Sequence, residues 1–171
     1  MLVIYKSSRI EATILMLGCN FKNVGIIFLN IEIIDEPSAE LTTFLDEKIA
    51  EFNWARWEVS ERKAIAVKLA DDNGEVIAGA AGRTFGDWLM INTLWVSESL
   101  RGQQVGSKLL QKIESAALAR GCNKALLDTL NFQAMPFYKK HGYQVQWTQE
   151  NYPKTGCKYY MVKQLANELD K

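Results

Sequence analysis

The chain has 171 residues, a length that suits one domain with a buried core, and its 20 basic residues balance its 20 acidic residues. This balance leaves no net charge to attract phosphate backbones or anionic bilayers, so nucleic acid and membrane surfaces are not expected as partners. The three cysteines, Cys19, Cys122 and Cys157, are far apart and suit neither a disulfide framework nor a metal cluster, so we expect a reducing, cytoplasmic compartment and no metal site.

Residues 1–28 are expected to form an N-terminal extension of uncertain structure, followed by a single domain over residues 29–171. The apolar run Ala12–Leu17 is shorter than the roughly 7 to 15 residues of a signal-peptide core, and Glu11 directly precedes it. The sequence also lacks the roughly 20 consecutive apolar residues that a membrane-spanning helix needs.

The domain is predicted to open with a strand and a helix. A β-branched run predicts a strand over Leu29–Ile34, and the following Asp-Glu-Pro-Ser sequence ends it. Apolar residues at helical spacing then predict a helix over Ser38–Phe52. The next residues, Asn53–Glu58, are expected to form a loop or lid that holds two tryptophans.

Three strands are predicted next, over Lys63–Ala70, Glu75–Phe85 and Trp88–Val96. The first two are separated by a segment that ends in Asn-Gly, and the last two by Gly-Asp. Because such dipeptides between apolar runs are typical of β-hairpins, we expect an antiparallel meander.

The pattern then changes to a helical period, which predicts a helix from Val105 to the Arg-Gly pair at 120–121. The remaining predicted elements are a buried strand, a short helix with proline in its first turn, and two closing strands. They cover Lys124–Asp128, Ala134–His141, Tyr143–Trp147 and Lys158–Leu165.

The stretch Trp95–Lys108 runs from a strand through a glycine-containing loop into an amphipathic helix. Unpaired backbone N–H groups and the positive end of the helix dipole meet at such a junction, and glycine lets a phosphate approach the main chain. The spacing of Gly102 and Gly106 matches neither a Walker A loop nor the dinucleotide fingerprint. The pattern alone therefore predicts an anion site or a plain glycine turn into a helix.

A second motif identifies a family. The segment Asn131–Tyr143 reads Asn-x-x-Ala-x-x-Phe-Tyr-x-x-x-Gly-Tyr, and it follows the Arg-Gly-x-x-x-Gly loop at Arg101–Gly106. The order of these motifs resembles the GNAT superfamily of N-acetyltransferases over roughly Leu29–Leu165. The resemblance implies a mixed α/β fold, with a central, twisted, mostly antiparallel sheet of six to seven strands and about four flanking helices.

The resemblance also implies that acetyl-CoA is the acyl donor. In the family, loop amides cradle the pyrophosphate, and the end of the preceding strand pairs with the pantetheine arm. The family signature places a glycine at the position of Gln104. The residues expected to bind the donor are Trp95, Val96, Arg101, Gly102, Gln103, Gln104, Val105, Gly106, Ser107, Asn131 and Tyr138.

For catalysis, the resemblance points to Tyr138 as the donor of a proton to the departing thiolate, because a phenol can give a proton or hydrogen bond to that sulfur. The alternative for Tyr138 is a half-buried core residue. The main-chain N–H of Val96 is the candidate stabiliser of the oxyanion. Asp128 is the first choice as general base, although it can instead orient Asn131, and a water chain or a neutral amine would make a base unnecessary.

The predicted function is transfer of an acetyl group to a primary amine of a small molecule or peptide, by direct attack in a ternary complex. A catalytically silent CoA-binding module and an enzyme that uses a larger acyl group stay open, as does a homodimer. We expect acceptor specificity to come from Phe52–Glu58 and Gln146–Lys158, where Trp147 and Tyr152 indicate an enclosed site. His141, in the last turn of a helix, is expected to be structural.

Overall fold

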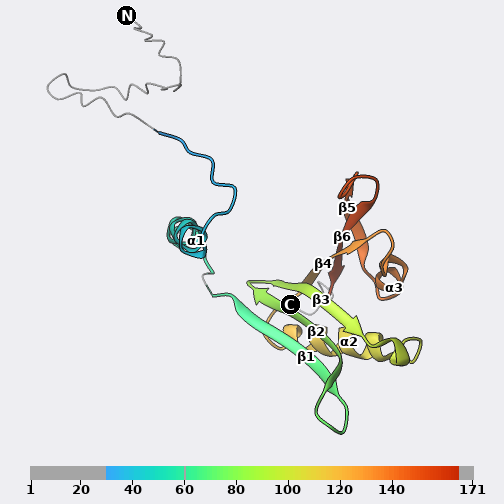
Figure 1. Ribbon diagram of the computed structural model, residues 1–171. Helices are drawn as coiled ribbons and strands as arrows, with labels where there is room; N and C mark the ends of the chain where they lie inside the picture. The colour runs from blue at the N-terminus through green and yellow to red at the C-terminus, as the bar shows by residue number, and fades with distance from the viewer. Residues whose placement is uncertain (1–29, 60, 166–171) are drawn as a thin grey trace, which may run out of the picture. The chain divides into compact units, whose positions relative to one another are not determined.

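The computed structural model describes residues 30–59 and 61–165, so the predicted N-terminal extension lies outside the described residues. The chain divides into two compact units, Met1–Glu51 and Phe52–Lys171. Helix α1 (Ala39–Trp54) crosses the boundary between them, and the strands of the described residues belong to the second unit (Figure 1).

Helix α1 begins with a side-chain cap, since the Leu41 N–H donates to Ser38 Oγ at 3.2 Å. The strand predicted over Leu29–Ile34 is wrong for Asn30–Ile34, which have no regular secondary structure, and Leu29 lies outside the described residues. Ile31 and Ile33 are 90% and 89% exposed. A strand needs a neighbour for its N–H and C=O groups, and no described strand pairs with this segment.

The second unit is built on one six-stranded sheet with the order β1-β2-β3-β4-β6-β5. All neighbours are antiparallel except β3 and β4, which are parallel. The mixed fold class and the mostly antiparallel sheet are therefore confirmed, and the described strands number six. They are β1 (Lys63–Ala70), β2 (Val76–Phe85), β3 (Trp88–Val96), β4 (Lys124–Leu130), β5 (Gln144–Glu150) and β6 (Cys157–Gln164).

The described α-helices are α1, α2 (Val105–Leu118) and α3 (Met135–Lys140), and a 3₁₀ turn at Glu98–Leu100 follows β3. The predicted bounds need small corrections. Helix α2 ends at Leu118, two residues before the Arg-Gly pair, whereas β4 continues to Leu130 and β5 to Glu150.

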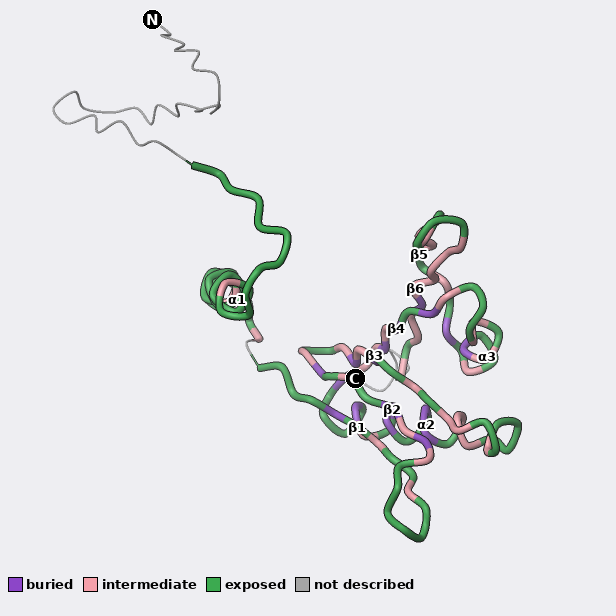
Figure 2. The backbone as a smooth tube through the Cα atoms, viewed as in Figure 1, coloured by how far each residue is buried: buried purple, intermediate pink, exposed green. Residues whose placement is uncertain are grey.

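The core lies mainly between α2 and the sheet (Figures 1 and 2). Helix α2 packs on β1, β2 and β3. The same hydrophobic cluster continues through β4 to α3 and β6, so one core connects both halves of the sheet. Its most buried members include Leu89, Leu110, Ile113, Ala117, Ala125, Tyr143 and Met161.

Strands β3 and β4 are paired over only four residues each, from Trp88 opposite Lys124 to Ile91 opposite Leu127. At that point β3 carries a bulge, because Ile91 and Thr93 lie opposite consecutive residues of β2 and leave Asn92 as the extra residue. β2 supports the bend with Gly82, where a Cβ atom would collide with the Met90 carbonyl. Beyond the bulge β3 and β4 separate and leave an opening in the sheet.

A buried ion pair ties α2 to the far half of the sheet. Glu114 accepts a hydrogen bond from the Tyr143 hydroxyl at 2.8 Å and another from Lys163 Nζ at 2.6 Å. Glu114 is 7% exposed. Burial, together with the adjacent Glu114 carboxylate, strongly raises the pKa of Tyr143, so this phenol stays protonated and keeps its donor role.

We predict that Glu114→Ala lowers the free energy of unfolding by about 3 kcal/mol, because it leaves Lys163 and the Tyr143 hydroxyl without their shared acceptor. Urea denaturation would measure this change. As a matched control, Glu61→Ala removes the exposed ion pair with Lys63 and should change the same quantity by less than about 1 kcal/mol. Equal losses in the two variants would contradict the role given to Glu114.

Candidate functional site

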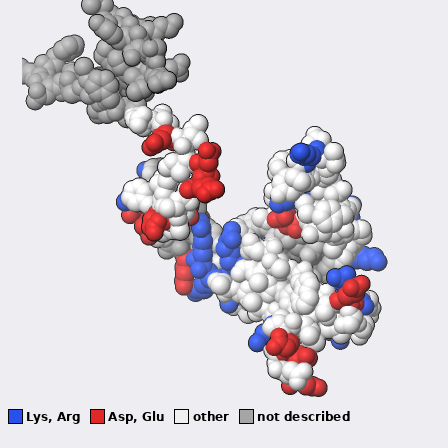
Figure 3. Space-filling model, viewed as in Figure 1, with Lys and Arg blue, Asp and Glu red and all other residues white. Residues whose placement is uncertain are grey.

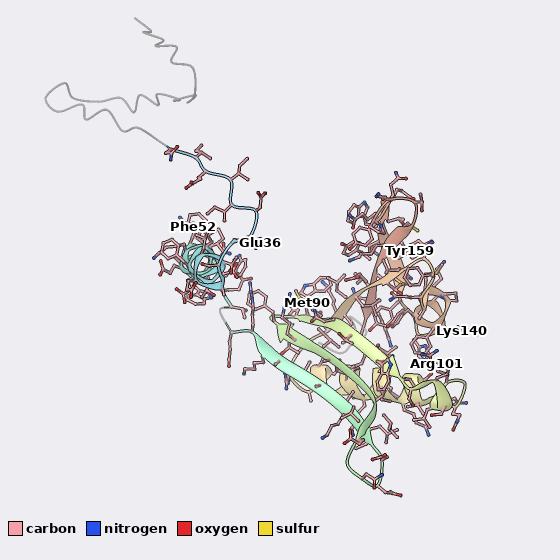
Figure 4. All side chains as sticks on the ribbon, in the orientation of Figure 1. Glu36, Phe52, Met90, Arg101, Lys140 and Tyr159 are labelled. Carbon is pink, nitrogen blue, oxygen red and sulfur yellow. The ribbon has the colours of Figure 1, made fainter. Side chains whose placement is uncertain are left out.

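The opening between β3 and β4 is a cleft of about 250 Å³. Figure 4 locates it by two labels, Met90 in the paired stretch of β3 and Arg101 beyond the end of that strand. The cleft therefore lies along the second half of β3. Its lining residues are Ile91, Asn92, Thr93, Leu94, Leu127, Asp128, Thr129, Gln133, Ala134 and Tyr138.

The two predicted catalytic residues approach this cleft from opposite faces of the sheet. Tyr138, on α3, packs in the core cluster with Leu127 and Met161. Asp128 follows Leu127 in β4, and successive strand residues point to opposite faces, so its carboxylate lies on the other face. The structure thus brings Tyr138 and Asp128 to one cleft.

Tyr138 is 8% exposed, yet it lines the cleft. Its ring makes edge contacts with Phe137 and Tyr143, at centroid distances of 5.1 and 5.8 Å, which fix its orientation. Burial raises the pKa of the Tyr138 phenol, and the nearby Asp128 carboxylate raises that pKa further. The phenol is therefore a proton donor, not a base, at neutral pH.

The main chain of β3 offers hydrogen-bonding groups to the cleft. The Ser97 N–H donates to the Ile77 carbonyl of β2 at 3.0 Å. In an antiparallel ladder, alternate residues bond to the same neighbour, so Trp95 also directs its main chain to β2, whereas Leu94 and Val96 direct theirs away from β2, to the side on which β3 and β4 separate. Of these two residues, Leu94 lines the cleft and Val96 lies just beyond its lining. Leu94 is an addition that ladder alternation identifies.

The loop after β3 leads into an uncapped helix. Gly102 and Gln104 adopt left-handed backbone conformations, with φ of 76° and 62°. The Lys108 N–H donates to the Gln104 carbonyl at 3.1 Å, and α2 has no side-chain cap. The N–H groups of the first helical residues, Val105–Ser107, hence precede the helical bonding pattern and are available to an anion.

Two other predicted binding residues have partners within the protein. Arg101 Nε donates to the Val96 carbonyl at 3.4 Å, so this side chain folds back towards the end of β3. Gln103 Nε2 donates to the Ser99 carbonyl at 2.8 Å. Both contacts hold the loop in place between strand and helix.

Asp128 and Asn131 have different partners and do not bond to each other in the structure. Asp128 Oδ2 forms an ion pair with Lys158 Nζ at 3.2 Å. The Asn131 N–H donates to the Cys157 carbonyl at 3.0 Å, and a Cβ at Gly156 would lie 3.0 Å from Asn131 Oδ1. Asn131 therefore lies against the turn between β5 and β6. The sequence pattern does not identify Lys158 as a site residue. The one signal is that Lys158 and Tyr160 lie two residues apart on a predicted strand and so share a face.

A larger hollow, of about 380 Å³, lies at the β2–β3 turn and is lined by Trp57, Phe85 and Trp88 among others. The Arg62 guanidinium lies 5.3 Å from the Phe85 ring centroid, and Lys124 Nζ lies 5.4 Å from that of Trp88. This hollow is at the paired end of β3, and its lining includes neither Tyr138 nor Asp128.

His141 and Cys122 have contacts within the protein and do not line the cleft. His141 Nδ1 contacts the Phe137 carbonyl at 2.9 Å, and its ring packs on Phe137. The Cys122 thiol is buried, which raises its pKa and disfavours the reactive thiolate. Within residues 30–59 and 61–165, acidic, histidine and cysteine side chains form no group able to hold a metal ion.

The distribution of charged side chains on the surface is consistent with the equal numbers of basic and acidic residues in the chain. On the face drawn in Figure 3, neither sign of charge forms a continuous area over the β-sheet unit. The helices of the described region are also too short or too polar to cross a membrane.

The family profile, two relatives and one solved structure that match this chain are all of acetyltransferases. The acetyltransferase (GNAT) family profile matches residues 28–143. An acetyltransferase of Agrobacterium fabrum is 31% identical over 115 residues, which are 67% of this chain and 84% of that protein. A blasticidin-S acetyltransferase of Streptomyces morookaense is 32% identical over 101 residues, 58% of this chain and 74% of that protein. The crystal structure of an acetyltransferase from Bacillus cereus has a TM-score of 0.71 and 29% identity, and the match covers 78% of this chain and 97% of that one.

The left-handed conformation of Gln104 predicts that Gln104→Gly stabilises the protein. Glycine removes the steric cost of a side chain at positive φ, so we expect the free energy of unfolding to rise by about 0.5–1 kcal/mol and the Tm by about 1–4 °C. Thermal denaturation would measure the change. Gln103→Gly is the matched control, because Gln103 has no positive φ and its side chain bonds Ser99; its Tm should fall. A lower Tm for both variants would contradict the strain at Gln104.

Proposed function

The chain belongs to the acetyltransferase (GNAT) family, and from this premise we propose that it transfers the acetyl group of acetyl-CoA to a primary amine by direct attack in a ternary complex. One observation carries the proposal. The separation of β3 from β4 opens a cleft that contains a buried phenol, and the strand bordering this cleft leads into an uncapped helix N-terminus.

In this proposal the donor lies along β3 and the loop that follows it. The amides of Gly102–Ser107 bind the pyrophosphate, with the positive end of the α2 dipole behind them. The pantetheine arm pairs with the main chain of Leu94 and Val96, while Trp95 and Arg101 support this end of the strand. Asn131 acts on the donor only indirectly, through the turn that it holds.

The reaction then needs three groups around the thioester. The amine nitrogen attacks the carbonyl carbon and forms the C–N bond, and the charge that develops on the carbonyl oxygen meets the Val96 N–H. The C–S bond breaks, and Tyr138 gives its proton to the departing thiolate. Asp128, on the opposite face, takes the proton that the amine loses, either directly or through water.

For the acceptor, we favour a small amine-bearing molecule over a peptide. The relative named for blasticidin-S supports this choice, because the name describes acetylation of a small molecule. The cleft is also small, about 250 Å³, and Asp128, which lines it, pairs with Lys158 beside the Tyr152 ring. We place the reaction in the cytoplasm, which suits the free thiols of Cys122 and Cys157.

The first test is calorimetric titration of the full chain with acetyl-CoA, followed by incubation with a panel of small amines and detection of CoA and acetylated amine by mass spectrometry. We expect binding and transfer. Binding without transfer to any amine would favour a silent CoA-binding module. Faster transfer from a longer acyl-CoA would show that the transferred acyl group is larger than acetyl. Absence of binding would overturn the donor assignment.

Tyr138→Phe is predicted to lower kcat about 100-fold, within the range for loss of a general acid, while the Kd for acetyl-CoA stays within about twofold. Because the phenol pKa is raised, the wild-type kcat should not fall through phenol ionisation below about pH 10. Stopped-time assays across pH would measure both effects. Tyr159→Phe removes the same hydroxyl from a tyrosine that does not line the cleft and should keep the wild-type kcat. An unchanged kcat in Tyr138→Phe would refute the proton-donor role.

A further inference from the structure

The face of the sheet opposite α2 and α3 carries an ammonium group held by one carboxylate and two aromatic rings. Lys158 Nζ lies 3.2 Å from Asp128 Oδ2. It also lies 4.8 Å from the Tyr152 ring centroid and 5.8 Å from that of Tyr160. A carboxylate combined with aromatic faces is the chemistry that binds organic ammonium ions.

Three parts of the protein form this site: the β4–β6 ladder, strand β5 and the turn between β5 and β6. Tyr160 lies directly opposite Asp128 in the β4–β6 ladder, so the two side chains share a face, and Lys158 is the diagonal neighbour. Trp147 of β5 stacks on the Tyr160 ring at a centroid distance of 5.0 Å. The Tyr152 N–H donates to the Gly156 carbonyl at 2.8 Å, which closes the turn that carries the Tyr152 ring.

The site adjoins the reaction cleft, because Asp128 belongs to both. We propose that Asp128, Tyr152 and Tyr160 form a seat for the ammonium group of the acceptor, and that Lys158 occupies this seat until the acceptor displaces it. The inference rests on the proposed acetyl transfer and deepens it. The acceptors are aliphatic amines that arrive protonated, and Lys158 sets the selectivity for them.

Two properties of Lys158 suit a displaceable occupant. Its hydrogen bond to Asp128 raises the pKa of its ammonium, so the nitrogen keeps its proton and does not itself attack the thioester. The Asp128 side chain is 47% exposed and that of Lys158 is 20% exposed, so water reaches the carboxylate and screens the ion pair in part. Exchange of one ammonium for another conserves the charge of the site, so a cationic acceptor displaces Lys158 more readily than a neutral molecule does.

After displacement, the acceptor nitrogen is beside Asp128 and next to the cleft that Tyr138 lines. The ammonium loses one proton to Asp128 or to water, and its lone pair then attacks the thioester carbonyl from the face opposite Tyr138. Lys158, still protonated, moves into solvent. A neutral alcohol or an amide has no positive charge to attract the Asp128 carboxylate, so it does not displace Lys158.

The seat can be tested without any acetyl transfer. The full chain, with carbon-13-labelled lysine, is titrated with millimolar n-butylammonium chloride, and the Lys158 Cε resonance is assigned by its absence in Lys158→Met. We expect n-butylammonium to shift this resonance, and n-butanol at equal concentration to leave it unchanged. Equal shifts from both, or from neither, would overturn the seat.

Kinetics provide the second measurement. Lys158→Met empties the seat with little change in side-chain length, so we expect the KM for an aliphatic amine acceptor to fall by about fivefold, the upper range for one exposed ion pair. The KM for an aromatic amine, neutral at assay pH, should stay unchanged, as should the Kd for acetyl-CoA. Lys154→Met is the matched control: it removes the same charge from an exposed position of the same turn and should not change the KM for either amine.

The outcomes separate this inference from the proposed function. Displacement of Lys158 by n-butylammonium without acetylation of any amine would support the seat and refute the proposed function. Acetyl transfer with the same KM in wild type and Lys158→Met, for charged and neutral amines alike, would support the proposed function and overturn the seat. A merely structural ion pair would lower the Tm of Lys158→Met without altering the preference between the two amines.

Discussion

The site depends on one interruption of the sheet, where parallel pairing between β3 and β4 stops after Ile91 and Leu127. Backbone N–H and C=O groups that leave a ladder need other partners, because buried unpaired groups are costly. The bulge at Asn92 turns β3 away, and the ladder with β2 continues past it, so β3 keeps its neighbour on one side only. The main-chain groups of Leu94 and the Val96 N–H thereby have no strand partner on that side, whereas the Val96 carbonyl accepts from Arg101. An extended donor that supplies the missing pairing would complete the sheet in place of β4.

The same strand also sets the position of the proposed anion site, since only the short segment from Ser97 to Gln104 separates the end of β3 from α2. Two left-handed residues reverse the chain there, and the helix starts without a side-chain cap. α2 is in turn fixed by its core packing on β1–β3 and by the buried Glu114 bridge to Tyr143 and Lys163. The amides of the first helical turn and the cleft are therefore positioned by one shared core, as a long donor that contacts both would require.

Local sequence patterns were sufficient for most of the fold. The Asn-Gly and Gly-Asp turns predict the β1–β2–β3 meander, and the helical spacing after Val105 predicts α2, because both depend on residues close in sequence. The segment Asn30–Ile34 has the composition of a strand but no partner strand, which composition cannot reveal. Lys158 was missed for a related reason. Its role comes from ladder register, which places it diagonal to Asp128, thirty residues away in the sequence, and no local pattern encodes that register.

The electrostatics of the cleft link its two faces. The Asp128 carboxylate raises the pKa of Tyr138, which keeps the phenol protonated but makes it a weaker acid. A cation seated on Asp128 offsets this effect, because its positive charge reduces the field of the carboxylate at the phenol. In the resting protein Lys158 supplies that charge, and in the proposed complex the acceptor replaces it. When the acceptor then transfers its proton to Asp128 in that mechanism, the ammonium and the carboxylate become neutral together, so the phenol still faces no net negative charge at the step in which the thiolate departs. In the proposed mechanism the base and the acid thus act in sequence from the two faces of the sheet.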